Sequence, residues 1–154
     1  MTLNTTSTLT GGRFLEYDED KVMKLMSEAF DALGNLKELS EIPEEEFLSN
    51  KHYIASAKYN LLVAIESCID MAYHIISRNR MRIPNDYGDT FRVLNESGLI
   101  DEDLTQRLIT MARFRNRLVH IYWDIDSRMI YKIIREDIRD IEGFIERIKD
   151  ALKV

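Results

Sequence analysis

Apolar residues recur at intervals of three and four along most of the chain, which is the spacing of an amphipathic α-helix. The first segment with this pattern runs from Asp18 to Ser40, and Asp18 with the acidic residues after it is suited to begin a helix. Pro43 and the acidic run that follows it end this helix and start the next. The apolar positions of the first helix are Val22, Leu25, Met26, Ala29, Leu33, Leu36 and Leu39.

A longer helix is predicted from Phe47 to Ser77. Its middle is apolar over a wide arc, so we expect it to be the central helix of a bundle. After it, Pro84 and Gly88 mark a loop, because proline disfavours helix at the preceding residue and glycine is common in turns. A short helix follows this loop and ends at Gly98.

Two more helices are predicted in the last third of the chain. One runs from Asp101 to about Trp123, and the other is amphipathic and covers residues 129–152, with a break between them. Together these segments predict a single all-α domain, a four-helix up-and-down bundle with one short extra helix. We assign this domain to residues 17–154 and expect residues 1–16, which are polar and rich in threonine, to be disordered.

The composition narrows the fold and the cellular setting. The 154 residues include only six glycines and two prolines, too few for a turn-rich all-β protein. Cys68 is the only cysteine, which rules out an intramolecular disulfide and a cysteine-based zinc site. No apolar run approaches the roughly 18 residues that a membrane span needs. We therefore expect a cytoplasmic protein with no membrane contact.

One ten-residue stretch, "RFRNRLVHIY", concentrates unusual chemistry at the end of a predicted helix. On a helical wheel, Arg115 and Tyr122 fall on the buried arc with the apolar residues. An arginine there is costly unless it is paired or lines a cleft. One interpretation is that it meets a carboxylate such as Glu66 or Asp70 on the central helix.

The other interpretation is that Arg115, Asn116, His120 and Tyr122 line an anion-binding cleft. Arginine binds phosphate through two parallel hydrogen bonds, and histidine moves protons near neutral pH. These are the two groups that metal-free phosphodiester cleavage needs. Arg115 and His120 are, however, separated by about 140° of rotation and about 7.5 Å of rise on a straight helix. A joint site then requires a distorted helix or a second protomer, so we expect a twofold dimer.

Glu66, Asp70 and His74 recur every four residues and form one stripe on the central helix. These side chain types can bind a metal ion, but such a stripe is more often a polar seam or a support for a buried arginine. No metal or nucleotide motif accompanies it. We therefore expect no metal and no cofactor, and we keep these three residues as supports behind the candidate site.

The segment Arg115–His120 fits the Arg-x4–6-His motif of the HEPN superfamily. With Tyr122 added, it resembles the HepT-type toxins, which pair with MntA-type minimal nucleotidyltransferase antitoxins. The blocks "YNLLVAIESCIDMAYHII" and "IPNDYGDTFRVLNESGLI" are similar to that family's second helix and to its proline loop with the short helix. The resemblance extends from about Lys51 to Ile125.

This resemblance implies an α-helical, dimeric, metal-independent ribonuclease that acts on mRNA or tRNA. By carry-over, Arg115 and His120 are the catalytic residues, and Asn116 is the polar residue beside the arginine. Tyr122 matches the tyrosine that the partner nucleotidyltransferase modifies with adenylate. The alternative is a non-catalytic HEPN-like module that only docks a nucleotidyltransferase, and the intact Arg115 and His120 favour the ribonuclease.

The net charge of −6 raises the question of where RNA would bind, since the molecule as a whole does not attract a polyanion. Any affinity for RNA has to come from a local cluster of positive charge. Such a cluster can form only if the fold brings distant arginines together. The candidates are Arg78, Arg80, Arg82, Arg113 and Arg117.

Overall fold

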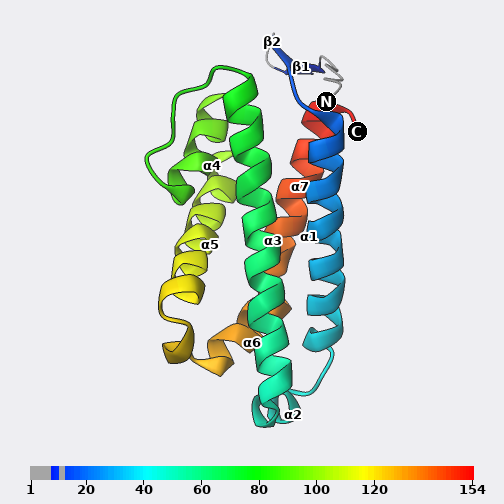
Figure 1. The fold of residues 1–154 in the computed structure, drawn as a ribbon, viewed down its shortest axis with the longest axis vertical. Helices are drawn as coiled ribbons and strands as arrows, with labels where there is room; N and C mark the ends of the chain where they lie inside the picture. Colours follow the sequence, from blue (N-terminus) through cyan, green and yellow to red (C-terminus); the bar gives the residue numbers. More distant parts are fainter. Residues whose placement is uncertain (1–7, 11–12) are drawn as a thin grey trace.

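A computed structural model describes residues 8–10 and 13–154 of the chain. Four long helices lie side by side and alternate in direction, and α3 occupies the centre (Figure 1). The prediction of an all-α four-helix up-and-down bundle is confirmed. The four helices are α1 (Glu19–Ser40), α3 (Lys51–Arg78), α5 (Glu102–His120) and α7 (Ile138–Leu152).

Shorter helices connect the long ones. The predicted short extra helix is α4 (Tyr87–Glu96), which packs against α5 and α3. At the other end of the bundle lie α2 (Glu44–Ser49), the 3-10 turn η1 (Tyr122–Asp124) and α6 (Ser127–Glu136). Within the described residues, no helix combines the length and the apolarity that crossing a bilayer requires.

Two predicted helices are each divided in the structure. The helix predicted from Phe47 to Ser77 is interrupted at Asn50, whose backbone is extended and whose side chain accepts hydrogen bonds from the N–H groups of His52 and Tyr53. This cap offers the backbone an alternative to a continuous helix. The final helix is likewise divided at Asp137, where the chain turns from α6 into α7.

The N-terminal segment corrects the predicted disordered tail. Residues 1–7 and 11–12 lie outside the described part of the chain, but β1 (Thr8–Thr10) and β2 (Arg13–Leu15) form an antiparallel pair. Leu15 is buried in the core. The side chain of Asn79, just after α3, bonds both the N–H and the carbonyl of Glu16, at 2.8 and 2.9 Å. The ordered domain therefore begins before residue 17, because tertiary contacts hold this segment.

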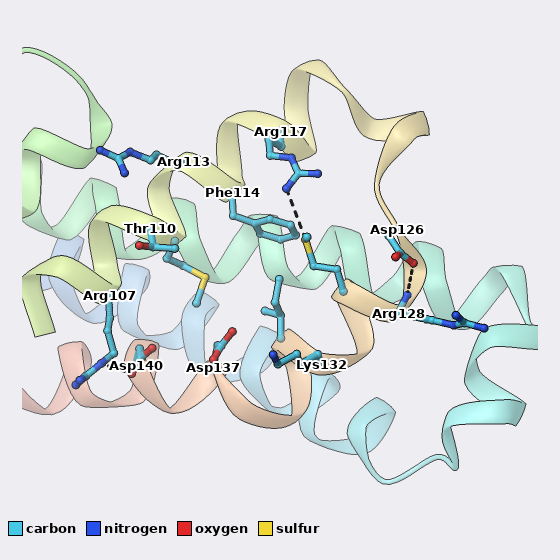
Figure 2. A pocket seen from close by; sticks show the side chains of 13 residues that line it. Arg107, Thr110, Arg113, Phe114, Arg117, Asp126, Arg128, Lys132, Asp137 and Asp140 are labelled. Atoms are coloured by element: carbon cyan, nitrogen blue, oxygen red, sulfur yellow. Dashed lines mark hydrogen bonds and ion pairs between the residues drawn. The ribbon is translucent and has the colours of Figure 1, made fainter.

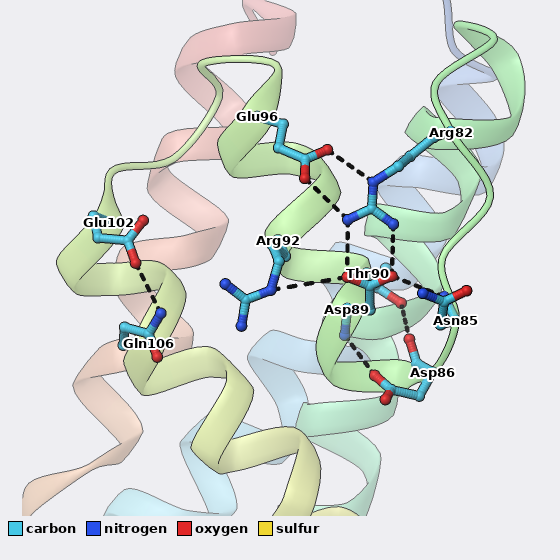
Figure 3. Close-up of polar contacts among 9 residues, drawn as sticks. All are labelled: Arg82, Asn85, Asp86, Asp89, Thr90, Arg92, Glu96, Glu102 and Gln106. Atoms are coloured by element: carbon cyan, nitrogen blue, oxygen red, sulfur yellow. Dashed lines mark hydrogen bonds and ion pairs between the residues drawn. The ribbon is translucent and has the colours of Figure 1, made fainter.

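The loop between α3 and α4 is fastened by an ion-pair network around Arg82 (Figure 3). Its guanidinium bonds Asp89 at 2.7 Å and Glu96 at 2.9 Å, and Asp89 also accepts the N–H of Asn85 at 2.8 Å. The hydrogen bond from Arg82 lowers the pKa of Asp89 to about 2. Arg82 is thus occupied by two carboxylates, so it does not supply the free positive charge for RNA that we considered from the sequence.

Candidate active site

An open cleft of about 690 Å³ lies where the second half of α5 faces α3 and the start of α4. Arg115, Asn116 and His120 all border it, so three of the four residues predicted to share an anion-binding cleft come together. The aromatic and loop residues of the opposite wall were not among those predicted from the sequence. The cleft is lined by Tyr73, Asn85, Asp86, Tyr87, Arg115, Asn116, Val119 and His120.

Both interpretations that the sequence left open apply to Arg115. Its side chain is only 15% exposed, and its Nη2 lies 2.8 Å from Oε1 of Glu66 on α3. Its Nη1 donates to Oδ1 of Asn116 at 3.2 Å, and its Cζ lies 4.5 Å from the ring centroid of Tyr87. The guanidinium is therefore paired with a carboxylate and also faces the cleft. Three neighbours hold it in place before any ligand arrives.

His120 is the last residue of α5, and its imidazole is exposed. Its side chain forms no hydrogen bond with another described residue, so both ring nitrogens remain available to a ligand. The sequence suggested that Arg115 and His120 could meet only through a distorted helix or a second protomer. In the structure α5 continues regularly to His120, and the cleft is open enough for both residues to border it within one chain.

The stripe of Glu66, Asp70 and His74 is divided between two places. Of these three residues, only Glu66 forms a hydrogen bond with Arg115. His74 is buried, and its Nε2 accepts the N–H of Asp18 at 2.8 Å, which ties α3 to the start of α1. Burial and the charge of Arg78 lower the pKa of His74 and favour this neutral acceptor. His74 and Asp70 border a different depression from the cleft.

A metal site does not emerge from this stripe. One ring nitrogen of His74, Nε2, already accepts a hydrogen bond and is not free to bind a metal. Burial, reinforced by the charge of Glu66, raises the pKa of Asp70, which favours its protonated form. Over the described part of the chain, no three histidine, cysteine, aspartate or glutamate side chains are arranged to hold a metal ion.

Tyr122 lies beyond the end of α5, in η1, and is not among the residues that line the cleft. The helical wheel predicted a place for Tyr122 on the buried arc. The helix ends at His120, however, so helical geometry does not extend to Tyr122. The side chain of Tyr122 is instead half-exposed. Lys58 on α3 holds this turn: its Nζ donates to the carbonyl of Tyr122 at 3.0 Å and lies 4.3 Å from the ring centroid.

Residues 29–148 match the sequence model of a family described as "Ribonuclease HepT-like", which covers the cleft, Tyr122 and most of the bundle. The chain belongs to the HepT-like family. A putative RNase of Archaeoglobus fulgidus is 33% identical over 115 residues, or 75% of this chain and 85% of that protein. The mRNA nuclease HepT of Shewanella oneidensis is 33% identical over 90 residues, 58% of this chain and 68% of the relative.

The HepT-like fold is also seen in a solved complex. The structure of a tri-AMPylated Shewanella oneidensis HEPN toxin with its MNT antitoxin superposes with a TM-score of 0.79 and 25% identity. The match covers 86% of this chain and 98% of the toxin chain. The resemblance drawn from the sequence is therefore confirmed at the level of family and fold.

Proposed function

We propose that this HepT-like protein is a metal-independent endoribonuclease that cleaves RNA phosphodiester bonds in the cleft of α5. The observation that carries the proposal is that Arg115 and His120 border the same open cleft. The guanidinium of Arg115 would stabilise the charge that develops on the phosphate. His120 would take the proton of the attacking 2′-hydroxyl or give one to the leaving oxygen.

The contacts of Arg115 support a role as a phosphate ligand. Glu66 accepts from Nε and Nη2, and Asn116 accepts from Nη1. A guanidinium has five N–H donors, so two remain for a phosphate oxygen. Glu66 and the ring of Tyr87 restrict the rotation of the side chain. In this scheme Arg115 is the catalytic cation, and Glu66 and Asn116 position it.

The test is RNA cleavage by the purified protein in the presence of EDTA. We expect single-stranded mRNA fragments or tRNA to be cleaved at the same rate with EDTA as with magnesium, because protein groups supply both the charge and the proton. Product formation is followed on denaturing gels. Cleavage that EDTA abolishes and magnesium restores would overturn the proposed chemistry. Absence of cleavage in both conditions, together with binding to a nucleotidyltransferase, would favour the non-catalytic docking module.

We further propose a homodimer whose interface includes the end of α5. Four large hydrophobic or aromatic side chains are exposed around the end of α5: Val119, Ile121, Tyr122 and Trp123, the last of them 81% exposed. A run of this kind commonly marks a surface that another protein covers. A twofold axis near these residues would bring two copies of the Arg115–His120 segment together.

Light scattering tests the dimer. We expect a mass close to twice the 18.1 kDa of one chain at micromolar concentration, and the monomer mass for the Trp123→Glu variant. A charge placed in the apolar patch would be buried without a partner in the dimer, which weakens association. Met23→Glu serves as the control, because Met23 is an exposed apolar residue on α1. A wild-type protein that remains at 18.1 kDa would contradict the proposal.

The proposed regulator is a minimal nucleotidyltransferase that transfers adenylate to the Tyr122 hydroxyl. The solved complex of an AMPylated HEPN toxin with an MNT antitoxin supports this proposal, as does the exposure of Tyr122 two residues after His120. An added adenylate is an anion and would compete with RNA phosphate for nearby cations.

We place the protein in the cytoplasm, where a free and buried thiol such as that of Cys68 stays reduced.

A further inference from the structure

A second cavity of about 690 Å³ opens on the other side of α5, against α6 and the start of α7 (Figure 2). We call it the α5–α6 groove. Arg113 and Arg117 line it from α5, and Arg128 and Lys132 line it from α6. Phe114 points into the space between the two helices. The groove therefore combines an apolar interior with cations contributed by both walls.

The charge of the groove opposes the charge of the whole protein. Its lining includes five cations and three aspartates, on a chain whose net charge is −6. Arg107 is engaged by Asp103 and Asp140, but the four other cations form no salt bridge with a described carboxylate. The four are Arg113, Arg117, Arg128 and Lys132.

The three acidic residues of the groove leave its five cations with a net excess of positive charge. Asp126 caps α6 by accepting the N–H of Arg128 at 2.9 Å. Asp140 is paired with Arg107 at 2.8 Å. Burial, followed by the charge of Asp140, raises the pKa of Asp137. The α5–α6 groove is thus a local cationic cluster of the kind that RNA binding by an acidic protein requires.

A third depression joins the groove to the active-site cleft. It has a volume of about 250 Å³, and its lining includes Arg92 and Arg113. It shares Asn85, Asp86 and Asn116 with the cleft and Arg113 with the groove. The three hollows therefore follow one another around α5 without a gap in their lining. Arg92 lies at the side of the Arg82 network, beside Asp89 (Figure 3).

We propose that this continuous surface is the track of single-stranded RNA, an inference that rests on the proposed ribonuclease function. The scissile phosphate lies in the cleft at Arg115 and His120, and the strand passes over Asn116 to Arg113. In the α5–α6 groove, phosphates meet Arg113 and Arg117, and an unpaired base packs on the apolar floor at Phe114.

The form of the groove selects single strands. An A-form duplex keeps its bases stacked inside and offers mainly phosphates and 2′-hydroxyls to a protein. An unpaired base has two apolar faces and can pack in a hollow where Met129, 37% exposed, lies over the largely buried Phe114 and Met111. Arg117 already lies with its Nη1 3.6 Å from the sulfur of Met129, at the edge of that floor.

The salt dependence of binding tests the track. Affinity of a fluorescent single-stranded RNA is measured from 0.05 to 0.5 M salt with the His120→Ala protein, which binds without cleaving. Adding Arg113→Ala and Arg117→Ala removes two phosphate contacts. We expect the slope of log K against log salt to become shallower by about 1.4. Over the tenfold range of salt, the affinity of the variant then changes about 25-fold less than that of the parent.

A matched control removes two exposed cations outside the three hollows, Lys24 and Arg147, by replacing both with alanine in the same background. Its slope should equal that of the His120→Ala parent. Equal slopes for the groove variant and the parent would overturn the track. So would a groove variant that keeps its RNA affinity but no longer binds a nucleotidyltransferase, since the groove would then be a protein-docking surface.

Two further measurements separate this inference from the proposed activity. A duplex RNA of the same length should bind about tenfold more weakly than the single strand, and equal affinities would overturn the selection of single strands. Cleavage by the wild-type protein is assayed independently. If it cleaves no RNA but the groove variant still loses salt-dependent binding, the proposed function fails and the RNA track stands.

Discussion

Replacing His120 by alanine is expected to lower the rate of RNA cleavage by about 10²-fold or more, the usual contribution of a general acid or base. The imidazole borders the cleft, is exposed and has no hydrogen bond to another described side chain. Its loss removes the group that moves the proton, while Arg115 remains held by Glu66. Initial rates on a single-stranded RNA, measured at saturating substrate, give the effect on the chemical step.

The chain provides a matched control for this substitution. His52 is an exposed histidine at the start of α3, and only its backbone N–H takes part in the Asn50 cap. His52→Ala should therefore retain full activity, and circular dichroism should show the same helical content in both variants. A His120→Ala protein that cleaves at more than about a tenth of the wild-type rate would exclude His120 as the proton-transfer group.

Replacing Tyr122 by phenylalanine is expected to abolish adenylate transfer and leave the protein active in the presence of a nucleotidyltransferase partner. In the transfer, the phenolic oxygen bonds to the α-phosphorus of ATP, pyrophosphate leaves, and the phenolic proton passes to a base on the partner. Phenylalanine has no oxygen to make that bond. The ring itself can keep its place beside Lys58, because that contact is made to the face of the ring.

Intact-mass spectrometry after co-expression with the partner measures the outcome. The wild type should gain mass in adenylate units, and Tyr122→Phe should gain none. Tyr59→Phe is the control, because Tyr59 is 66% exposed on α3 and offers a comparable hydroxyl. Adenylate found on another residue would refute the assignment, and so would full neutralisation of Tyr122→Phe by the partner.

The helices could be predicted because their determinants are local. Asp18 does cap α1, accepting the N–H of Lys21, and Asp101 caps α5 by accepting that of Leu104. The apolar spacing of each segment then decides which face is buried. The interruption at Asn50 was not predicted, because the apolar spacing continues through it while the side-chain cap competes with the helix.

The sequence by itself determined the bundle, the family and the α5 residues of the candidate site, since helical period and the Arg115–His120 spacing are readable along one chain. Only the tertiary structure decided which partners those residues have. Glu66 and Asp70 stand one turn apart on α3, and either could have met Arg115; the packing of α5 on α3 selects Glu66. Likewise the cations of the α5–α6 groove belong to helices separated in sequence, and a periodic pattern carries no information on which faces of two helices meet.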